Sequence, residues 1–124
     1  MPIIDHSGVP EVPWRPDYRK WDLVGSRDGL STNLSYSIAE VGAGAPIHIH
    51  QDVELITILE GNLEVRIGDE VRIVGPDHTL AIPSGVPHGF TVVGEVAAKL
   101  LVFFPTADPF AGTTYLEGSP PSGR

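Results

Sequence analysis

Short runs of alternating apolar and polar residues fill the middle of the chain, and no segment repeats its apolar residues with helical spacing. Alternation puts every second side chain on the same face of a strand, so each run predicts a β-strand with one buried face. Turn-forming Gly, Pro, Asn and Asp residues separate the runs. The predicted strands span residues 34–39, 46–50, 53–60, 62–67, 70–74, 79–82, 88–93 and 98–104.

Many short strands joined by Gly and Pro turns predict an all-β fold, either a sandwich or a barrel. We expect residues 30–105 to form the barrel, residues 1–29 an N-terminal arm and first edge strand, and residues 106–124 a C-terminal tail. Gly61-Asn62 and Gly68-Asp69 are predicted two-residue hairpin turns, because glycine adopts positive φ without steric cost. Both ends contain prolines and aromatic residues. Each end could lie along its own barrel or cross to a second subunit and cover a sheet edge.

Composition narrows the possible functions. A chain of 124 residues suits one core, and the absence of cysteine excludes disulfides, thiolate metal sites and cysteine nucleophiles. Eight basic and 16 acidic residues give a net charge of −8, so we expect no nucleic-acid partner. The longest apolar run, VAAKLLVFFP, is too short to span a bilayer, and the first residues lack a signal-peptide pattern. We therefore expect a cytoplasmic protein without a membrane partner.

Histidine and glutamate side chains interrupt the apolar pattern at a few positions. His48 and His50 point the same way from one predicted strand, and Glu54 lies at the start of the next. If these two strands lie side by side, the three side chains can converge. His88, after the sharp IPSGVP turn, is a fourth candidate. His6 and His78, in the proline-rich arm and in a turn, are not expected to bind metal.

A metal ion would explain this group of polar side chains inside a barrel. Left unpaired there, each would cost on the order of several kcal/mol. A divalent transition metal (Fe, Mn, Ni, Co, Cu or Zn) would accept every lone pair at once. Four protein ligands on an octahedral ion leave two positions open for substrate or dioxygen, which indicates chemistry or recognition rather than a structural role.

The same positions resemble the two motifs of the cupin superfamily. The first motif, G(x)5HxH(x)3–4E(x)6G, is matched by Gly42, His48, His50, Glu54 and Gly61. The second, G(x)5PxG(x)2H(x)3N, is matched by Pro83, Gly85 and His88, whereas Asp77 and Val92 replace its first Gly and its Asn. The resemblance implies a small single-domain cupin with a jelly-roll-type conserved β-barrel. It also implies a metal held by His48, His50, Glu54 and His88.

The predicted cavity wall is mostly apolar. From strand alternation we expect it to contain Tyr36, Ile38, Ile56, Ile58, Phe90 and Val92, with either Leu100, Val102 and Phe104 or Leu101 and Phe103. Tyr36 would be its one polar group, and Lys99 would point to solvent. Without a cluster of Arg or Lys, a sugar phosphate or a small dicarboxylate is disfavoured, and an aromatic or mostly apolar substrate is favoured.

These features predict a metal-dependent enzyme acting on a small organic molecule. A dioxygenase-like reaction is the leading hypothesis, with Glu54 as ligand and, when displaced by substrate, as general base, as the resemblance to flavonol dioxygenases implies. A polyketide cyclase or isomerase, in which the metal only polarises a carbonyl, is the alternative enzyme. A non-enzymatic, metal-dependent binding module is the third hypothesis. The aromatic arms and the cupin resemblance also favour a homodimer.

Overall fold

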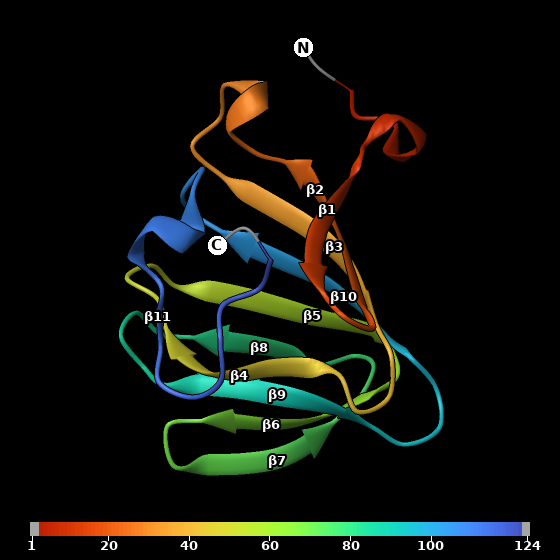
Figure 1. Cartoon of the computed structure of the whole chain (residues 1–124), viewed down its shortest axis with the longest axis vertical. Coiled ribbons are helices and arrows are strands. Elements are labelled where there is room, and N and C mark those ends of the chain that lie inside the picture. The colour runs from red at the N-terminus through yellow and green to blue at the C-terminus, as the bar shows by residue number, and fades with distance from the viewer. Residues whose placement is uncertain (1–2, 123–124) are drawn as a thin grey trace.

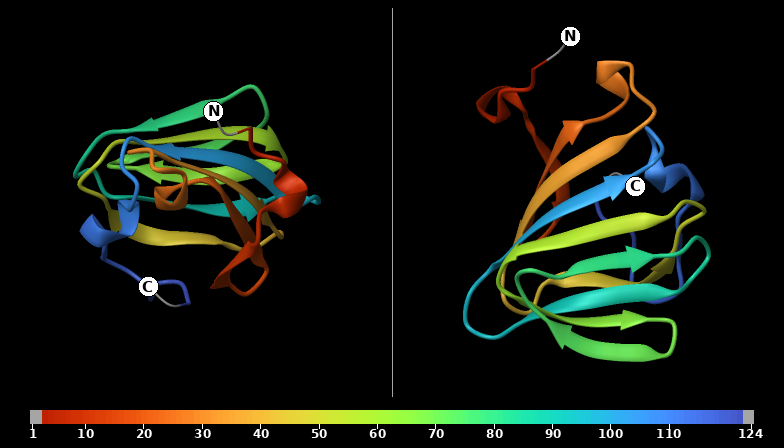
Figure 2. Two further views of the ribbon diagram at one scale, coloured as in Figure 1. Left: turned by 90° about the horizontal axis from the view of Figure 1, so that it is seen from above. Right: turned by 180° about the vertical axis from the view of Figure 1, so that it is seen from behind.

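The computed structural model describes residues 3–122, which fold into two antiparallel sheets facing each other (Figures 1 and 2). The six-stranded sheet has the order β1-β2-β3-β10-β5-β8, and the five-stranded sheet has the order β11-β4-β9-β6-β7. The elements are η1 (His6–Gly8), β1 (Glu11–Arg15), β2 (Tyr18–Val24), η2 (Ser26–Asp28), β3 (Asn33–Ala39), β4 (Gly44–Ile49), β5 (Glu54–Glu60), β6 (Asn62–Ile67), β7 (Glu70–Val74), β8 (Thr79–Ile82), β9 (His88–Val93), β10 (Ala98–Phe104), η3 (Pro109–Gly112) and β11 (Thr114–Tyr115).

The all-β prediction is confirmed, and the predicted strands match β3 to β10 closely. Strands β6 to β10 have the predicted bounds, and β3, β4 and β5 begin or end one or two residues away from them. All three helices in residues 3–122 are short 3-10 turns. In this range no helix is long and apolar enough to span a bilayer.

Gly61 marks a crossing between the sheets rather than a hairpin. Strand β5 belongs to the six-stranded sheet and β6 to the five-stranded one, so the hairpin predicted at Gly61-Asn62 is wrong. Gly61 has a φ of 81°, and a Cβ there would lie 2.7 Å from the Ala98 Cα, so the crossing needs glycine for two reasons. The hairpin at Gly68-Asp69 is confirmed, because β6 and β7 pair up to Ile67 and Glu70.

Residues 11–24 and 114–122 lie along the barrel of their own chain. Residues 11–15 and 18–24 form the β1–β2 hairpin at the edge of the six-stranded sheet, and β11 pairs with β4 at the edge of the other. Figure 1 shows the C-terminal segment crossing the front of the barrel between these edges. The aromatic residues of both ends lie at this open side of the barrel, namely Trp14, Tyr18, Phe110 and Tyr115.

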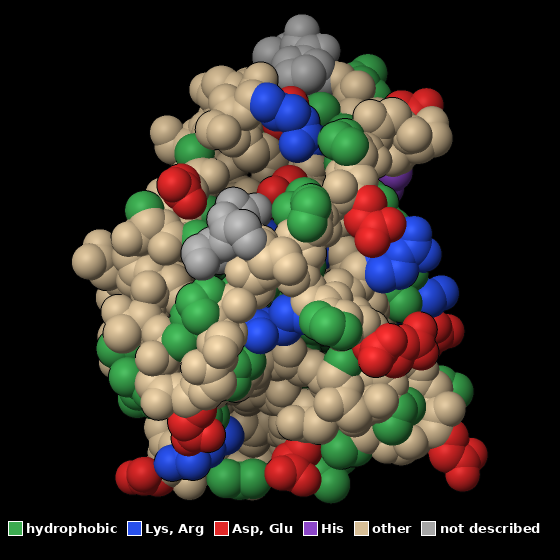
Figure 3. Space-filling model, in the orientation of Figure 1, with side chains coloured by type: hydrophobic (Ala, Val, Ile, Leu, Met, Phe, Trp, Pro, Cys, Tyr) green, Lys and Arg blue, Asp and Glu red, His purple; other side chains and the backbone are tan. Residues whose placement is uncertain are grey.

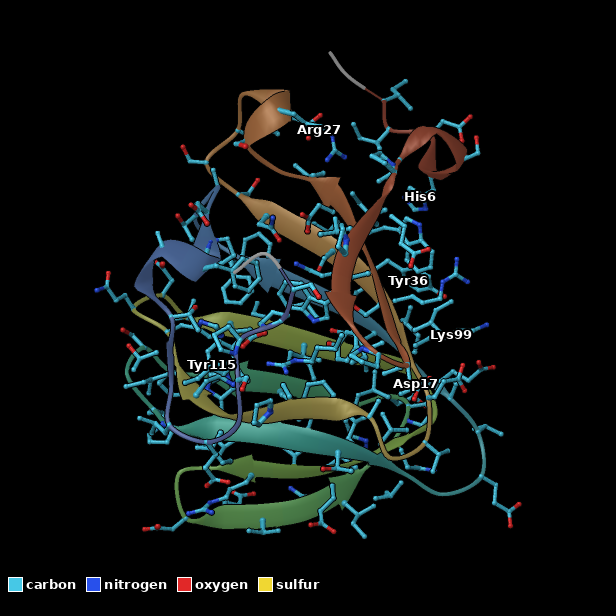
Figure 4. The ribbon with its side chains drawn as sticks, viewed as in Figure 1. His6, Asp17, Arg27, Tyr36, Lys99 and Tyr115 are labelled. Carbon is cyan, nitrogen blue, oxygen red and sulfur yellow. The ribbon has the colours of Figure 1, made fainter. Side chains whose placement is uncertain are left out.

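Strand β3 presents the opposite face to the one predicted. Its buried residues are Asn33, Ser35, Ser37 and Ala39, so the prediction that Tyr36 and Ile38 face the cavity is wrong. Tyr36 lies on the outer face, 5.8 Å from the Trp21 ring between centroids (Figure 4). Alternation misled here because the outer face of this sheet is itself apolar, while small polar serines lie inside. Lys99 points to solvent as predicted and pairs with Glu60 at 3.3 Å.

Candidate metal centre

Four ligand-type side chains from both sheets meet inside one end of the barrel. His48 in β4 lies directly opposite His88 in β9 within the five-stranded sheet. His50 follows the end of β4, and Glu54 begins β5 in the opposite sheet. Strands β4 and β5 are therefore not side by side, as the sequence had suggested they could be. The ligand atoms converge across the barrel instead, all within 4.8 Å of one another.

The four side chains are buried, with exposed fractions of 6% for His48, 4% for His50, 7% for Glu54 and 2% for His88. The Nε2 atoms of His48 and His50 are 3.0 Å apart. Oε1 of Glu54 lies 3.2 Å from Nε2 of His50 and 2.9 Å from Nε2 of His88. Metal–ligand bonds of about 2.1 Å place neighbouring donor atoms about 3 Å apart, so these separations suit donors sharing one ion.

The hydrogen bonds of the other ring nitrogens assign the tautomers. Nδ1 of His48 lies 2.6 Å from the Pro46 carbonyl and Nδ1 of His88 lies 2.9 Å from the Val86 carbonyl, so both nitrogens must donate. Nδ1 of His50 lies 2.6 Å from Oγ1 of Thr113. That hydroxyl donates to the Pro109 carbonyl at 3.0 Å, so it accepts from His50. In the neutral rings all three Nε2 atoms therefore carry lone pairs toward the centre.

This arrangement of lone pairs requires a positive charge. Nε2 of His48 faces Nε2 of His50, and the Glu54 carboxylate faces two further lone pairs, which is repulsive without a cation between them. In the metal-free protein this positive charge would have to come from a proton on one of the imidazoles. Burial would raise the pKa of Glu54, but its contacts with His50 and His88 outweigh burial and hold that pKa at about 2. Burial, then the neighbouring His88, lowers the pKa of His48 to about 4. The donor set thus fits a divalent metal ion.

The turn before β9 is fastened to the segment that carries His50. The Gly85 N–H donates to the His50 carbonyl at 2.9 Å, and the Ser84 hydroxyl donates to the Gln51 carbonyl. Gly85 has a φ of 77°, as a sharp turn into β9 requires. Asp77, which replaces the first glycine of the second motif, also has positive φ, at 65°. The chain therefore adopts positive φ at this position without a glycine, and the four ligands still converge.

A narrow cavity, with about 40 Å³ accessible to the centre of a water molecule, lies above the four ligands and opens to solvent. Of the residues expected in its wall, Ile56, Phe90, Val102 and Phe104 line it, whereas Ile58 and Val92 belong to the apolar core. The remaining lining residues come from β1, β2, β3, β4, η3 and β11; they are Trp14, Arg15, Tyr18, Lys20, Ser35, Ser37, Ala45, Phe110 and Tyr115. The expectation of a wall with no Arg or Lys is wrong, because the N-terminal hairpin contributes both.

The C-terminal tail completes the centre. Thr113 positions His50, and the Tyr115 ring stacks on His48 with centroids 5.2 Å apart. Tyr115 lines the cavity, and Figure 4 shows it beside β11, well apart from Tyr36 and Lys99. No spacing rule in the sequence pointed to Thr113 or Tyr115. His6 and His78 are exposed and lie outside the four-residue group.

A family model described as a cupin domain matches residues 36–104, so the chain belongs to the cupin domain family. The match contains all four candidate ligands. No curated protein matches the chain in sequence. The fold and the centre together define a small cupin whose His3Glu group suits a metal ion.

Several solved structures share the fold. The polyketide cyclase RemF from Streptomyces resistomycificus has a TM-score of 0.79 and 22% identity, covering 96% of this chain and 87% of that chain. The cupin-2 domain protein Rru_A2000 from Rhodospirillum rubrum has a TM-score of 0.76 and 21% identity, with 94% and 83% covered. A mutant of the oxalate decarboxylase OxdC from Bacillus subtilis has a TM-score of 0.75 and 23% identity, covering 89% of this chain but only 31% of that one.

Proposed function

We propose that this protein is a metal-dependent enzyme that acts on an aromatic small molecule with an enol or phenol oxygen, by a cyclase-like reaction without net oxidation. The observation that carries the proposal is the convergence of four lone-pair donors at the floor of a cavity with aromatic walls. The similarity to the polyketide cyclase RemF extends over nearly the whole chain, including the hairpin and tail that line this cavity. That extent supports a related substrate type.

His48, His50, Glu54 and His88 would hold the metal. When bound, a divalent ion supplies Lewis acidity toward a substrate oxygen and thereby favours the enolate. The carboxylate of Glu54 is ionised at neutral pH, since its pKa is about 2, and would be the anionic ligand. It would accept a proton from the substrate only once substrate displaces it from His50 and His88, because those contacts keep it a weak base.

The cavity wall would orient the substrate and exclude water. Trp14, Phe90, Phe104 and Phe110 offer ring faces and edges for a planar molecule. Tyr18 is buried, and burial raises the pKa of its phenol, so it stays protonated and can donate to a developing oxyanion. These residues supply binding and hydrogen-bond donation within the cavity.

The donor set favours a second candidate, the dioxygenase-like reaction predicted from the sequence. Three imidazoles and one carboxylate suit redox metals such as iron, manganese, nickel or copper, and they leave coordination positions for both substrate and dioxygen. The two candidates differ in their need for oxygen rather than in their ligands.

Oxygen dependence separates the candidates. Protein loaded with a single metal would be incubated with hydroxylated aromatic and β-diketone compounds, with and without dioxygen, and products followed by mass spectrometry. We expect metal-dependent turnover that continues without oxygen and gives products of unchanged oxidation state. Oxygen consumed in proportion to product would establish the dioxygenase instead. Stoichiometric metal without turnover on the whole panel would favour a binding module. His78→Ala is the matched control for a histidine outside the centre.

We further propose that the chain forms a homodimer through the outer face of the six-stranded sheet. Most of this face is apolar, with Thr57 opposite Leu101 and with Arg19 and Lys99 on either side of Ile38. Its large apolar residues are Trp21, Leu34, Tyr36, Leu55, Leu101 and Phe103. Strands β2, β3, β10 and β5, each of seven residues, present a flat area of about 440 Å². Side chains that project from this area raise its solvent-accessible surface toward the roughly 600 Å² that each partner buries in a small interface. Among the aromatic residues of the arms, Trp14, Tyr18, Phe110 and Tyr115 line the cavity of their own chain, whereas Trp21 lies on this outer face. Leu101→Glu should yield monomers by sedimentation, whereas dimers in that variant would exclude this face.

A further inference from the structure

Two of the chain's eight basic residues line the metal cavity, although the chain has a net charge of −8. Arg15 ends β1 and Lys20 lies in β2, so both belong to the N-terminal hairpin. In the space-filling view, blue Lys or Arg atoms lie in the hollow at the centre of the front face (Figure 3). Among the other described basic residues, four lie within 4.0 Å of an acid, namely Arg19, Arg27, Arg72 and Lys99, and Arg66 is exposed.

Lys20 is held in an aromatic enclosure beside the cavity. It is 4% exposed, and its Nζ lies 4.0 Å from the Trp14 ring centroid and 4.5 Å from that of Phe110. Asp22 Oδ1 is 3.2 Å away. Burying an ammonium is costly, and an apolar residue of similar volume would pack there at less cost. A purely structural role therefore does not account for a lysine at this position.

Arg15 lies where the hairpin meets the tail. Its Nη2 donates to the Ser119 carbonyl at 2.7 Å, and its guanidinium lies 5.5 Å from the Tyr115 ring centroid. Among residues 3–122 no carboxylate lies within 4.0 Å of this guanidinium to form an ion pair. Glu54 is the one acid among the cavity-lining residues, and a bound divalent ion would more than neutralise it. The loaded cavity would then carry excess positive charge.

We propose that the substrate is an anion with two separated polar ends. One end is an enol or phenol oxygen that faces the metal centre, and the other is a carboxylate that binds Arg15 and Lys20. The proposal rests on the proposed function and specifies its substrate class as aromatic hydroxy or keto acids. The fork of Arg15 suits a carboxylate geometrically, and the rings of Trp14 and Phe110 line the same cavity beside the Lys20 ammonium.

A matched pair of probes tests the carboxylate end. Zinc-loaded protein would be titrated by calorimetry with para-hydroxycinnamate and with its neutral carboxamide, which keeps the phenol at the opposite end. The acid should bind about tenfold more tightly or better, as a charge-assisted hydrogen bond implies. Trp21→Phe leaves Trp14 as the one tryptophan of a chain that has two, so its quenching locates the bound acid.

Substitutions of Arg15 and Lys20 test whether these two residues cause the tighter binding of the acid over the carboxamide. Arg15→Met and Lys20→Met should each remove most of the preference for the acid, Lys20→Arg should restore it, and Lys99→Met on the outer face should leave it unchanged. Thermal melts establish that each variant is folded. Equal affinity for acid and amide, or a preference that survives both methionine variants, would overturn the proposal. An acid preference that persists in chelator-treated protein would uphold the anion site by itself, whereas the absence of metal-dependent turnover on the aromatic panel would refute the proposed function and leave the anion site standing. Failure of both probes to bind would overturn the two together.

Discussion

Replacing Thr113 by valine removes one hydroxyl at nearly constant volume and tests whether the tail helps to hold the metal. The Thr113 hydroxyl accepts the Nδ1 proton of His50 at 2.6 Å and donates to the Pro109 carbonyl at 3.0 Å. Valine leaves the buried Nδ1–H without its acceptor and removes the constraint on the orientation of the ring. An unsatisfied buried donor costs about 1–3 kcal/mol. Loss of such an outer partner weakens metal binding about ten- to hundredfold.

Metal affinity is the appropriate measurement, because it requires no substrate. Zinc affinity would be determined by competition with a chromophoric chelator at neutral pH, together with the rise in melting temperature on adding metal. Thr113→Val should bind zinc ten- to hundredfold more weakly than the wild type. Thr113→Ser keeps the hydroxyl and should bind nearly normally. Thr114→Val changes the neighbouring exposed residue and should have no effect. Equal affinities for the two valine variants would refute the role assigned to Thr113.

Three further outcomes follow from the geometry. His50→Ala should abolish stoichiometric metal binding yet keep a cooperative melt, because the apolar strands carry the core; loss of the fold in circular dichroism would contradict this. Metal-free protein should lose about 3 kcal/mol of stability as pH falls from 6.5 to 4, since the unfolded state gains a proton at the ordinary imidazole pKa whereas burial holds that of His48 at about 4. In His48→Gln, the free energy of unfolding from denaturant titrations should depend much less on pH between 6.5 and 4. An unchanged pH dependence would exclude His48 as its source. Gly61→Ala should cost about 2 kcal/mol or more, given its φ of 81° and the Ala98 Cα 2.7 Å from the added carbon, whereas Gly8→Ala, in open space, should be nearly neutral.

The ligands and most strands could be predicted because their signals are local. Histidines two residues apart on one strand must share a face, and a glycine-flanked turn must precede His88, so fixed spacing carries the geometry. The pairing of strands is not local. The chain crosses between sheets at Gly61, and β4 pairs with β9 rather than with β5. A turn glycine looks the same in a hairpin and in a crossing, so the sequence could not separate the two.

The orientation of β3 shows a different limit. Alternation predicts which residues share a face but not which face is buried, and the usual choice assigns the apolar set to the interior. Here Ser35 and Ser37 lie inside, while Tyr36 lies on an outer face that is itself apolar. The choice fails when a cavity needs small polar lining and the outside of the sheet is also apolar. The two cavity cations, Arg15 and Lys20, were missed for a similar reason. A lysine near the edge of a sheet is expected to face solvent, whereas Lys20 is buried.

The division between predicted and missed residues has a functional consequence. All four candidate ligands lie within the matched family domain, residues 36–104, whereas Arg15, Lys20, Phe110 and Tyr115 lie outside it. The barrel motifs therefore build the metal centre, while the terminal segments build most of the mouth above it. Two cupins with the same ligands can then differ in substrate through segments that the motifs do not describe. Replacing the hairpin of residues 11–24 by the corresponding hairpin of another cupin should change which acids bind without changing zinc affinity. No residue of that hairpin is a candidate ligand or a hydrogen-bond partner of a ligand's Nδ1 atom.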